Sequence, residues 1–256
     1  MTAPDDAIPA ATLVLVRDRV GGPPDLLMVE RARDMAFAAG AVVFPGGRVD
    51  PGDYSIAGNP ALTFPHQFAP NDAAARVTAI RETIEETGVA VGFSADHGRL
   101  ASLRAQMAAG QDFSTLLARN GWRIDLDALV PFARWRPSFR ETRIFDTRFY
   151  VARAPSAAPE ATVDATENVR LFWASASDVL TAADRGEARI IFPTRRNLER
   201  LTCLSSFAEV VTDARTHSTE LVIPWIEERD GRSFLCIPED RGYPITAEPL
   251  QSAIRG

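Results

Sequence analysis

The sequence predicts a mixed α/β sandwich that ends in a helix and a β-hairpin. Helical and extended patterns alternate along the 256 residues without an internal repeat, which is typical of a layered α/β domain. Hydrophobic residues make up 46% and charged residues 24%, ordinary values for a globular protein. A chain of this length buries about 70–75% of its unfolded surface. We therefore expect one domain over residues 1–256 that folds without disulfides or a structural metal.

Three short strands are predicted before residue 48. Apolar or alternating runs mark them at Thr12–Val16, Leu26–Glu30 and Ala41–Phe44. The first two flank Gly21-Gly22-Pro23-Pro24, which disrupts regular structure, so they are expected to form a hairpin. The third ends in the turn Pro45-Gly46-Gly47. From Arg48 to about Asn71 the chain is rich in Gly, Pro and Asp, and we expect a loop there.

Helices dominate the next fifty residues. Asn71 or Asp72 is the expected N-cap of a helix that runs to about Thr87, with Gly88 in the C′ position. Two further segments follow, an extended one at Val89–Phe93 and a helical one at 98–120 that is interrupted near Gly110.

The second half alternates strands with capped helices. Strands are predicted at Glu141–Ala152, Val169–Trp173, Leu221–Ile226 and Ser233–Ile237, with a turn at Asp230-Gly231 between the last two. Ser177 is the expected N-cap of a short helix that ends near Arg185. Thr194 is the expected N-cap of a longer helix that ends near Asp213 and carries an apolar stripe.

The charge pattern excludes several kinds of partner. A net charge of −6 does not favour nonspecific binding to nucleic acid. No apolar run approaches the ~18–20 residues of a membrane-spanning helix. The acidic first ten residues do not resemble a secretory signal, so we expect a cytoplasmic protein. All 28 basic residues are arginines, so an anion must be held by Arg or by backbone N–H groups.

Three glutamates share one face of the helix predicted to end near Thr87. At ~100° per residue, Glu85 and Glu86 lie within about 60° of Glu82, opposite the apolar stripe. Like charges at this spacing cost about 0.2–0.5 kcal/mol per pair, and Arg81 relieves only part of that. A divalent cation would relieve more, and carboxylate ligands suit Mg²⁺ or Mn²⁺. A solvated acidic face is the alternative interpretation.

The segment from Gly47 to Val89 resembles the Nudix box. That box reads G, five residues, E, seven residues, R-E-U-x-E-E-x-G-U, where U is aliphatic. The run Arg81-Glu82-Thr83-Ile84-Glu85-Glu86-Thr87-Gly88-Val89 matches the Arg, all three Glu, the Gly and the final aliphatic position of the second half. Asp53 stands where the family has Glu, and 27 residues, from 54 to 80, replace the usual seven. A box split by such an insertion, at about 54–71, resembles the peroxisomal coenzyme A diphosphatase branch of the Nudix hydrolases.

A second motif precedes the box. Nudix proteins that cleave coenzyme A carry L-L-T-x-R-[SA], three residues, R, three residues, G, three residues, F-P-G-G. This chain keeps the spacing, and its matching residues are Arg31, Ala32, Gly40 and Phe44-Pro45-Gly46-Gly47. Val29 replaces the Thr and Ala36 replaces the second Arg. Weaker similarity to the same branch continues through Arg143–Tyr150 and Trp173-Ala174-Ser175.

The resemblance implies a Nudix-type α/β/α sandwich with a C-terminal extension at about 194–256, and it implies roles for particular residues. The ligands of Mg²⁺ or Mn²⁺ would be Glu82, Glu85, Glu86 and the Gly46 carbonyl, with Arg81 orienting the carboxylates from behind. Glu85 or Glu86 would be the general base, and Glu167 is the second candidate for it. Contacts to the substrate would come from Arg31, Gly40, Phe44, Gly47, Arg140 and Arg143.

The resemblance also implies a substrate class. Coenzyme A or acyl-coenzyme A would be cleaved at its diphosphate, giving phosphopantetheine and adenosine 3′,5′-bisphosphate. Its roughly four negative charges would be offset by Arg31, Arg140 and Arg143, with Arg31 on the 3′-phosphate. ADP-ribose, a nucleotide sugar or NADH is the alternative substrate, and a non-catalytic binding module is the alternative of another class. We expect no nucleic-acid or membrane partner, and the sequence leaves a homodimer open.

Overall fold

A computed structural model describes residues 7–32, 40–93, 95, 97–137, 144–155 and 168–253. Its centre is a seven-stranded sheet made of β1 (Ile8–Arg17), β2 (Asp25–Arg31), β3 (Val42–Val43), β4 (Gly46–Arg48), β5 (Val130–Trp135), β6 (Phe145–Arg153) and β7 (Asn168–Ser175). The strand order is β3-β2-β1-β6-β5, while β4 also pairs with β1 and β7 with β2. The sheet is mixed, because β1 and β6 run parallel whereas β2 and β4 run antiparallel to β1.

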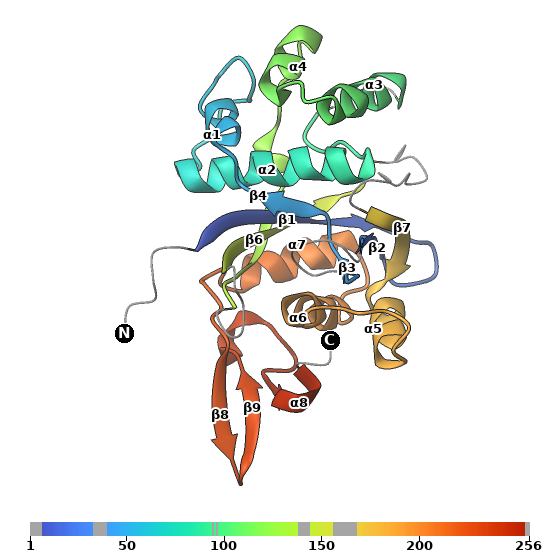
Figure 1. The fold of residues 1–256 in the computed structure, drawn as a ribbon, viewed down its shortest axis with the longest axis vertical. Coiled ribbons are helices and arrows are strands. Elements are labelled where there is room, and N and C mark those ends of the chain that lie inside the picture. Colours follow the sequence, from blue (N-terminus) through green and yellow to red (C-terminus); the bar gives the residue numbers. More distant parts are fainter. Residues whose placement is uncertain are drawn as a thin grey trace.

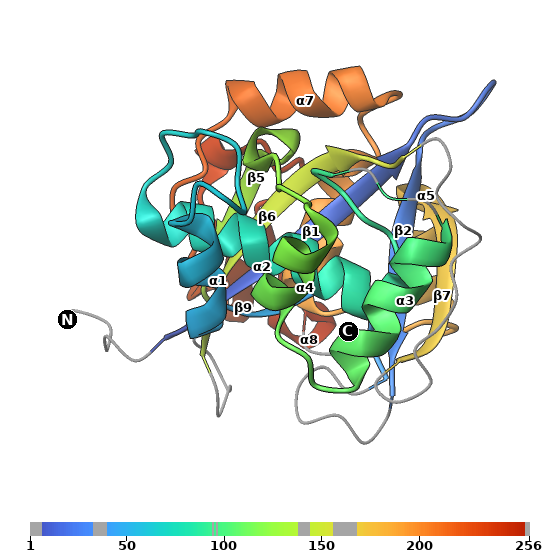
Figure 2. The same ribbon diagram turned by 90° about the horizontal axis from the view of Figure 1, so that it is seen from above.

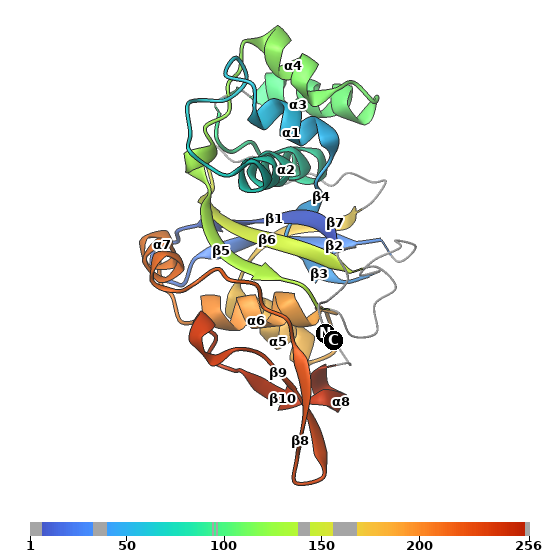
Figure 3. The ribbon, with the colours of Figure 1, turned by 90° about the vertical axis from the view of Figure 1, so that its left-hand side faces the viewer.

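Helices cover both faces of this sheet (Figures 1 and 3). One face carries α1 (Pro51–Ala57), α2 (Pro70–Thr87), α3 (His97–Ala108) and α4 (Phe113–Asn120). The other face carries α5 (Ala176–Asp184) and α6 (Phe192–Leu201), and α7 (Phe207–Thr216) lies along the β5 edge (Figure 2). Two 3-10 helices, Leu126–Ala128 and Glu239–Arg241, lie in connections.

A small second sheet extends beyond the α5–α6 layer (Figure 3). It consists of β8 (Trp225–Arg229), β9 (Arg232–Cys236) and β10 (Ala247–Pro249), in the order β10-β9-β8, and is followed by α8 (Leu250–Ala253). The turn of the β8–β9 hairpin is Asp230-Gly231, and both residues have a positive φ, of 48° and 73°. The predicted mixed α/β sandwich with a C-terminal helix and hairpin is confirmed.

Strand β1 separates two hydrophobic cores. Leu13 and Leu15 belong to the core that includes Ile80 of α2, whereas Val14 and Val16 belong to the core under α6 and α7. All four β1 residues are fully buried, because successive side chains of a strand point to opposite faces and helices cover both. Burying one such side chain stabilises the fold by about 1.5–3 kcal/mol.

The loop expected between Arg48 and Asn71 contains helix α1. Its start has a local cause: Pro51 occupies the first helical position and needs no N–H partner there. The Asp53 carboxylate then accepts a hydrogen bond from the backbone N–H of the N-cap residue Asp50 at 2.9 Å. The expectation of a loop was wrong because Gly, Pro and Asp also compose helix starts.

Helix α2 begins earlier than expected. Its N-cap is Ala69, with Pro70 at the first helical position, and not Asn71 or Asp72. The other end is as predicted, since Gly88 has φ 72° and its N–H donates to the Ile84 carbonyl at 2.9 Å.

Several other boundaries differ from the sequence-based expectations. Residues 89–93 form no strand, whereas β4 and β5 were not expected at all. The N-cap of α5 is Ser175 rather than Ser177, and that of α6 is Ile191 rather than Thr194. The single helix expected to end near Asp213 is two helices, because α6 ends at Leu201 and Ser206 caps α7.

Within the described part of the chain, no helix combines the length and the apolar character that crossing a lipid bilayer requires.

Candidate active site

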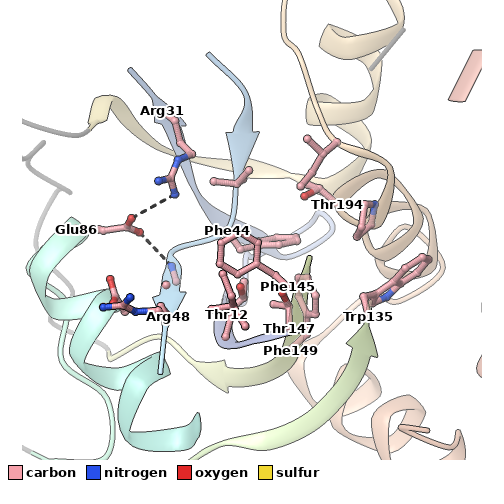
Figure 4. Close-up of a pocket in the computed structure, with 18 of the residues that line it drawn as sticks. Thr12, Arg31, Phe44, Arg48, Glu86, Trp135, Phe145, Thr147, Phe149 and Thr194 are labelled. Atoms are coloured by element: carbon pink, nitrogen blue, oxygen red, sulfur yellow. Dashed lines mark hydrogen bonds and ion pairs between the residues drawn. The ribbon is translucent and has the colours of Figure 1, made fainter. Parts of the chain in front are cut away.

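A cavity of about 480 Å³ lies where β4, the second half of α2 and the start of α6 come together (Figure 4). Its acidic wall is Glu82, Glu85 and Glu86, beside Gly46, Gly47, Arg31 and Arg48. Aromatic residues line the rest, namely Phe44, Trp135, Phe145 and Phe149, together with Thr12, Thr147 and Thr194. This volume lies within the ~300–1,000 Å³ typical of small-molecule sites.

Two glycines of β4 let three elements approach one another closely. A Cβ on Gly46 would lie 2.4 Å from the Ala11 carbonyl oxygen of β1. A Cβ on Gly47 would lie 2.4 Å from the carboxylate of Glu82 on α2. Any larger residue would therefore push β4 away from β1 or displace a glutamate, which explains why the turn needs both glycines.

Glu86 is held at the junction of β4 and β2. The Gly46 N–H donates to Glu86 Oε2 at 3.1 Å, and Arg31 Nη1 lies 3.9 Å from Glu86 Oε1 (Figure 4). The Glu86 side chain is only 7% exposed. Arg31 is also largely buried, and its Nε has no hydrogen-bond partner among the described residues. Arg31 thus belongs to the acidic wall of the cavity.

Glu82 and Glu85 share one cationic partner. Arg81 Nη1 lies 2.8 Å from Glu82 Oε1 and 3.1 Å from Glu85 Oε2. Burial raises the pKa of Glu82 to about 7, although Arg81 acts in the opposite direction. Burial also raises the pKa of Glu85, which is half-exposed. The alternative of a freely solvated acidic face is therefore wrong.

Arg81 is fixed from behind by Asp53. Arg81 Nε and Nη2 donate to Asp53 Oδ1 and Oδ2 at 2.9 and 3.0 Å, and Nη2 also donates to the Arg48 carbonyl. Burial by itself would lower the pKa of Arg81, but Asp53 and Glu82 together raise it above its ordinary value. Asp53 is 1% exposed and does not line the cavity, so it acts on the glutamates only through Arg81.

The chemistry of the donor set fits a hard divalent cation. Three carboxylates line one wall, and one oxygen each of Glu82 and Glu85 accepts no hydrogen bond from a described residue. In the present side-chain arrangement, no three His, Cys, Asp or Glu residues among those described converge closely enough to hold a metal ion.

The cavity contains some of the predicted substrate residues and not others. Arg31, Phe44 and Gly47 line it. Gly40 does not; it adopts φ 66° and lies at a separate cavity of about 770 Å³ near α5. Arg140, Arg143 and Glu167, as well as Ala36 of the upstream motif, lie outside the described residues.

Sequence reasoning missed the far side of the cavity. Trp135 comes from β5, which was not predicted, and Phe145 and Phe149 come from β6. Thr194 was interpreted only as a helix cap, yet it is the third residue of α6 and lines the cavity. The run Arg143–Tyr150 was the signal that could have identified the β6 contribution, because Phe145, Thr147 and Phe149 recur at every second position and so share one face of a strand.

Comparison with known proteins identifies the family. No family model matches the chain. The chain is similar to a solved Nudix hydrolase from Alicyclobacillus acidocaldarius, with 30% identity and a TM-score of 0.71 over 82% of this chain and 97% of that one. Fold and site thus define a hydrolase that acts on phosphoanhydride bonds, a class that uses divalent metals. The chain belongs to the Nudix hydrolases.

Two more distant matches agree with this assignment but carry no argument of their own. A MutT protein from Methanosarcina mazei Go1 has 13% identity and a TM-score of 0.43, over 78% of this chain and 97% of that one. The Nudix domain of Shewanella oneidensis NrtR, solved with ADP ribose, has 14% identity and a TM-score of 0.44, over 75% of this chain and 84% of that one.

Proposed function

We propose that this Nudix hydrolase cleaves the diphosphate of coenzyme A or acyl-coenzyme A, releasing phosphopantetheine and adenosine 3′,5′-bisphosphate. One observation carries the proposal. Arg31, Phe44 and Gly47, which keep the spacing of the coenzyme A motif, line the same cavity as the three box glutamates. The substitution of Val29 for the Thr of that motif removes no group from the cavity, because Val29 is fully buried in β2.

The metal of the family would be Mg²⁺ or Mn²⁺, held by Glu82, Glu85, Glu86 and the Gly46 carbonyl. When bound there, it would neutralise the diphosphate oxygens and acidify the attacking water. The residues of the chain position these glutamates. Arg81 positions Glu82 and Glu85 through its 2.8 and 3.1 Å contacts, and the Gly46 N–H positions Glu86.

The proton of the attacking water needs an acceptor within hydrogen-bond reach. Glu85 or Glu86 is the proposed acceptor, because both line the cavity and Glu85 keeps one oxygen free of hydrogen bonds from described residues. Glu167 stays the second candidate. Arg31 would offset part of the substrate's negative charge beside Glu86, where it already lies on the cavity wall.

A product analysis tests this proposal. The purified chain with Mg²⁺ or Mn²⁺ is incubated with coenzyme A, acetyl-coenzyme A, ADP-ribose, a nucleotide sugar and NADH, and products are identified by mass spectrometry. We expect the highest kcat/KM for coenzyme A or its acetyl ester, with adenosine 3′,5′-bisphosphate among the products. A higher kcat/KM for ADP-ribose or NADH would mean that this compound, and not coenzyme A, is the preferred substrate. No cleavage of any diphosphate would favour a non-catalytic module.

A further inference from the structure

The start of α6 has unpaired backbone donors, and Ile191, Pro193 and Thr194 of this segment line the cavity. Its N-cap Ile191 has no side chain that can accept hydrogen bonds, and its first turn contains no acidic residue. Pro193 has no N–H, and the backbone N–H groups of Phe192 and Thr194 donate to no described residue. A helix start carries about half a positive charge, and a buried start normally finds a partner for these N–H groups.

Thr194 adds a side-chain donor at the same point. It is 2% exposed, yet its hydroxyl makes no hydrogen bond to any described residue. It lines the cavity, and Figure 4 shows it on the α6 side, across Phe44 from Glu86. Because Thr194 lines the cavity, its hydroxyl can donate a hydrogen bond to a ligand there. Hydroxyl and backbone N–H groups together form a site for an anion.

The arginines of α6 do not compete for this role. Arg195 Nη2 lies 2.8 Å from Asp184 Oδ1, and Arg196 Nη2 lies 2.9 Å from Glu199 Oε1. Neither arginine lines the cavity. The positive potential at this end therefore comes from the helix start itself.

The two polar ends of the cavity are separated by an aromatic wall. Phe44 and Phe145 lie between the acidic wall with Arg31 and the α6 side with Thr194 (Figure 4). A ligand that fills the whole cavity must therefore be anionic at both ends and apolar or planar in between. In a nucleotide with a diphosphate at one position of its ribose and a phosphomonoester at another, the two anionic groups lie on either side of the sugar, and the planar base that branches from the sugar can pack on the aromatic residues.

We infer that the first turn of α6 and the Thr194 hydroxyl bind a phosphomonoester that the substrate carries apart from the diphosphate that is cleaved. The inference rests on the proposed function. It deepens that function because it assigns recognition of the phosphomonoester, the phosphate outside the diphosphate, to α6. Arg31 is then left to the diphosphate end of the substrate. The site distinguishes coenzyme A, which has a 3′-phosphate, from dephospho-coenzyme A, which has none.

Two variants and one matched control test the site. Thr194→Val removes the hydroxyl and keeps the β-branched shape. Thr194→Asp places an acid at the third position of α6, which favours the helix start but repels a phosphate. Thr212→Val makes the same hydroxyl-to-methyl change on the exposed face of α7, away from the cavity. Thermal unfolding is followed for all three, and Thr194→Asp is expected to melt no lower than the wild type.

Binding is measured without metal, so that the result does not depend on catalysis. Calorimetric titration compares adenosine 3′,5′-bisphosphate with AMP in EDTA. We expect the wild type and Thr212→Val to bind the bisphosphate about tenfold tighter, Thr194→Val to lose most of that preference, and Thr194→Asp to lose all of it. Equal binding of both ligands by the wild type, or an unchanged preference in Thr194→Asp, would overturn the inference.

Kinetics separate this inference from the proposed function. The ratio of kcat/KM for coenzyme A to that for dephospho-coenzyme A should fall about tenfold in Thr194→Val, through KM rather than kcat. A wild type that cleaves neither compound but binds the bisphosphate through Thr194 would refute the coenzyme A proposal and support the phosphate site. Equal losses for both substrates would mean that Thr194 contacts a part they share, and the inference would be wrong.

Discussion

Replacing Asp53 by Asn should destabilise the fold far more than replacing Asp50, its neighbour three residues earlier. The Asp53 carboxylate accepts two hydrogen bonds from Arg81, at 2.9 and 3.0 Å, and one from the Thr78 hydroxyl at 2.8 Å. In Asp53→Asn, the amide NH₂ group would point a donor at the N–H groups of Arg81 or the hydroxyl of Thr78, which are donors themselves. Breaking a buried ion pair from one side costs about 3–5 kcal/mol. At about 2–4 °C per kcal/mol for a chain of this size, Tm should fall by about 6–20 °C.

Asp50→Asn is the matched control. The Asp50 side chain is 44% exposed and lies 3.8 Å from Arg81, so its loss should cost about 0–1 kcal/mol. Thermal and urea unfolding in metal-free buffer measure both variants. Equal shifts in Tm would refute the conclusion that Asp53 fixes Arg81 through a buried ion pair.

The same pair of variants separates positioning from folding. Well below Tm, Asp53→Asn should lower kcat with little change in KM, because Arg81 would no longer orient Glu82 and Glu85. Asp53→Glu, which restores the residue type common in the family box, should recover part of kcat. Loss of activity only in proportion to the unfolded fraction would assign Asp53 a purely structural role.

Three further outcomes are expected. Hydrolysis should cease in EDTA and return with Mg²⁺ or Mn²⁺; activity that survives exhaustive chelation would remove the metal assignment. Arg31→Ala should slow cleavage of coenzyme A and ADP-ribose by the same factor, because Arg31 lies 3.9 Å from Glu86, at the diphosphate end that both substrates share. A loss of activity confined to coenzyme A would mean that Arg31 contacts the 3′-phosphate instead. Burial raises the pKa of Glu199 from 4.5 to about 7, so the folded chain binds the carboxyl proton more tightly than the unfolded chain does. The free energy of unfolding should therefore fall as pH rises between those values. Glu199→Gln should make the free energy of unfolding, measured with urea from pH 5 to 8, depend less on pH, and an unchanged pH dependence would contradict this.

The acidic helix could be predicted because its evidence is local. The periodicity of α2, its C-terminal Gly88 and the shared face of its glutamates all follow from sequence spacing. What covers that face could not be predicted. Glu86 is buried by Gly46 of β4 and Arg31 of β2, which lie 40 or more residues away in the sequence. Gly47 of β4 likewise lies against the Glu82 carboxylate, and burial is the main cause of the raised pKa of Glu82.

The errors at the helix boundaries have physical causes as well. The apolar stripe of α6 and α7 continues across their junction, so periodicity alone does not reveal the break. Ser206 reveals it, since its side chain accepts a hydrogen bond from the Glu209 N–H. At Thr194 the misplacement concealed a cavity residue: an N-cap hydroxyl accepts a hydrogen bond from its own helix, whereas Thr194 is the third residue of α6 and lines the cavity.

An insertion in the Nudix box, as the sequence resemblance implies, would be compatible with an intact site for a thermodynamic reason. Closing a flexible loop costs about 0.6 kcal/mol more for each doubling of its length, so passing from seven residues to the 27 of this chain costs about 1.2 kcal/mol. The Asp53–Arg81 pair outweighs that, at about 3–5 kcal/mol if one partner is lost. Residues of the segment contribute further, since Ile56 of α1 and Leu62 pack in the core of α2. The start of the box is therefore held on α2 by side-chain contacts rather than by the length of the connection. Asp53, buried beneath Arg81 and outside the cavity lining, belongs to these contacts.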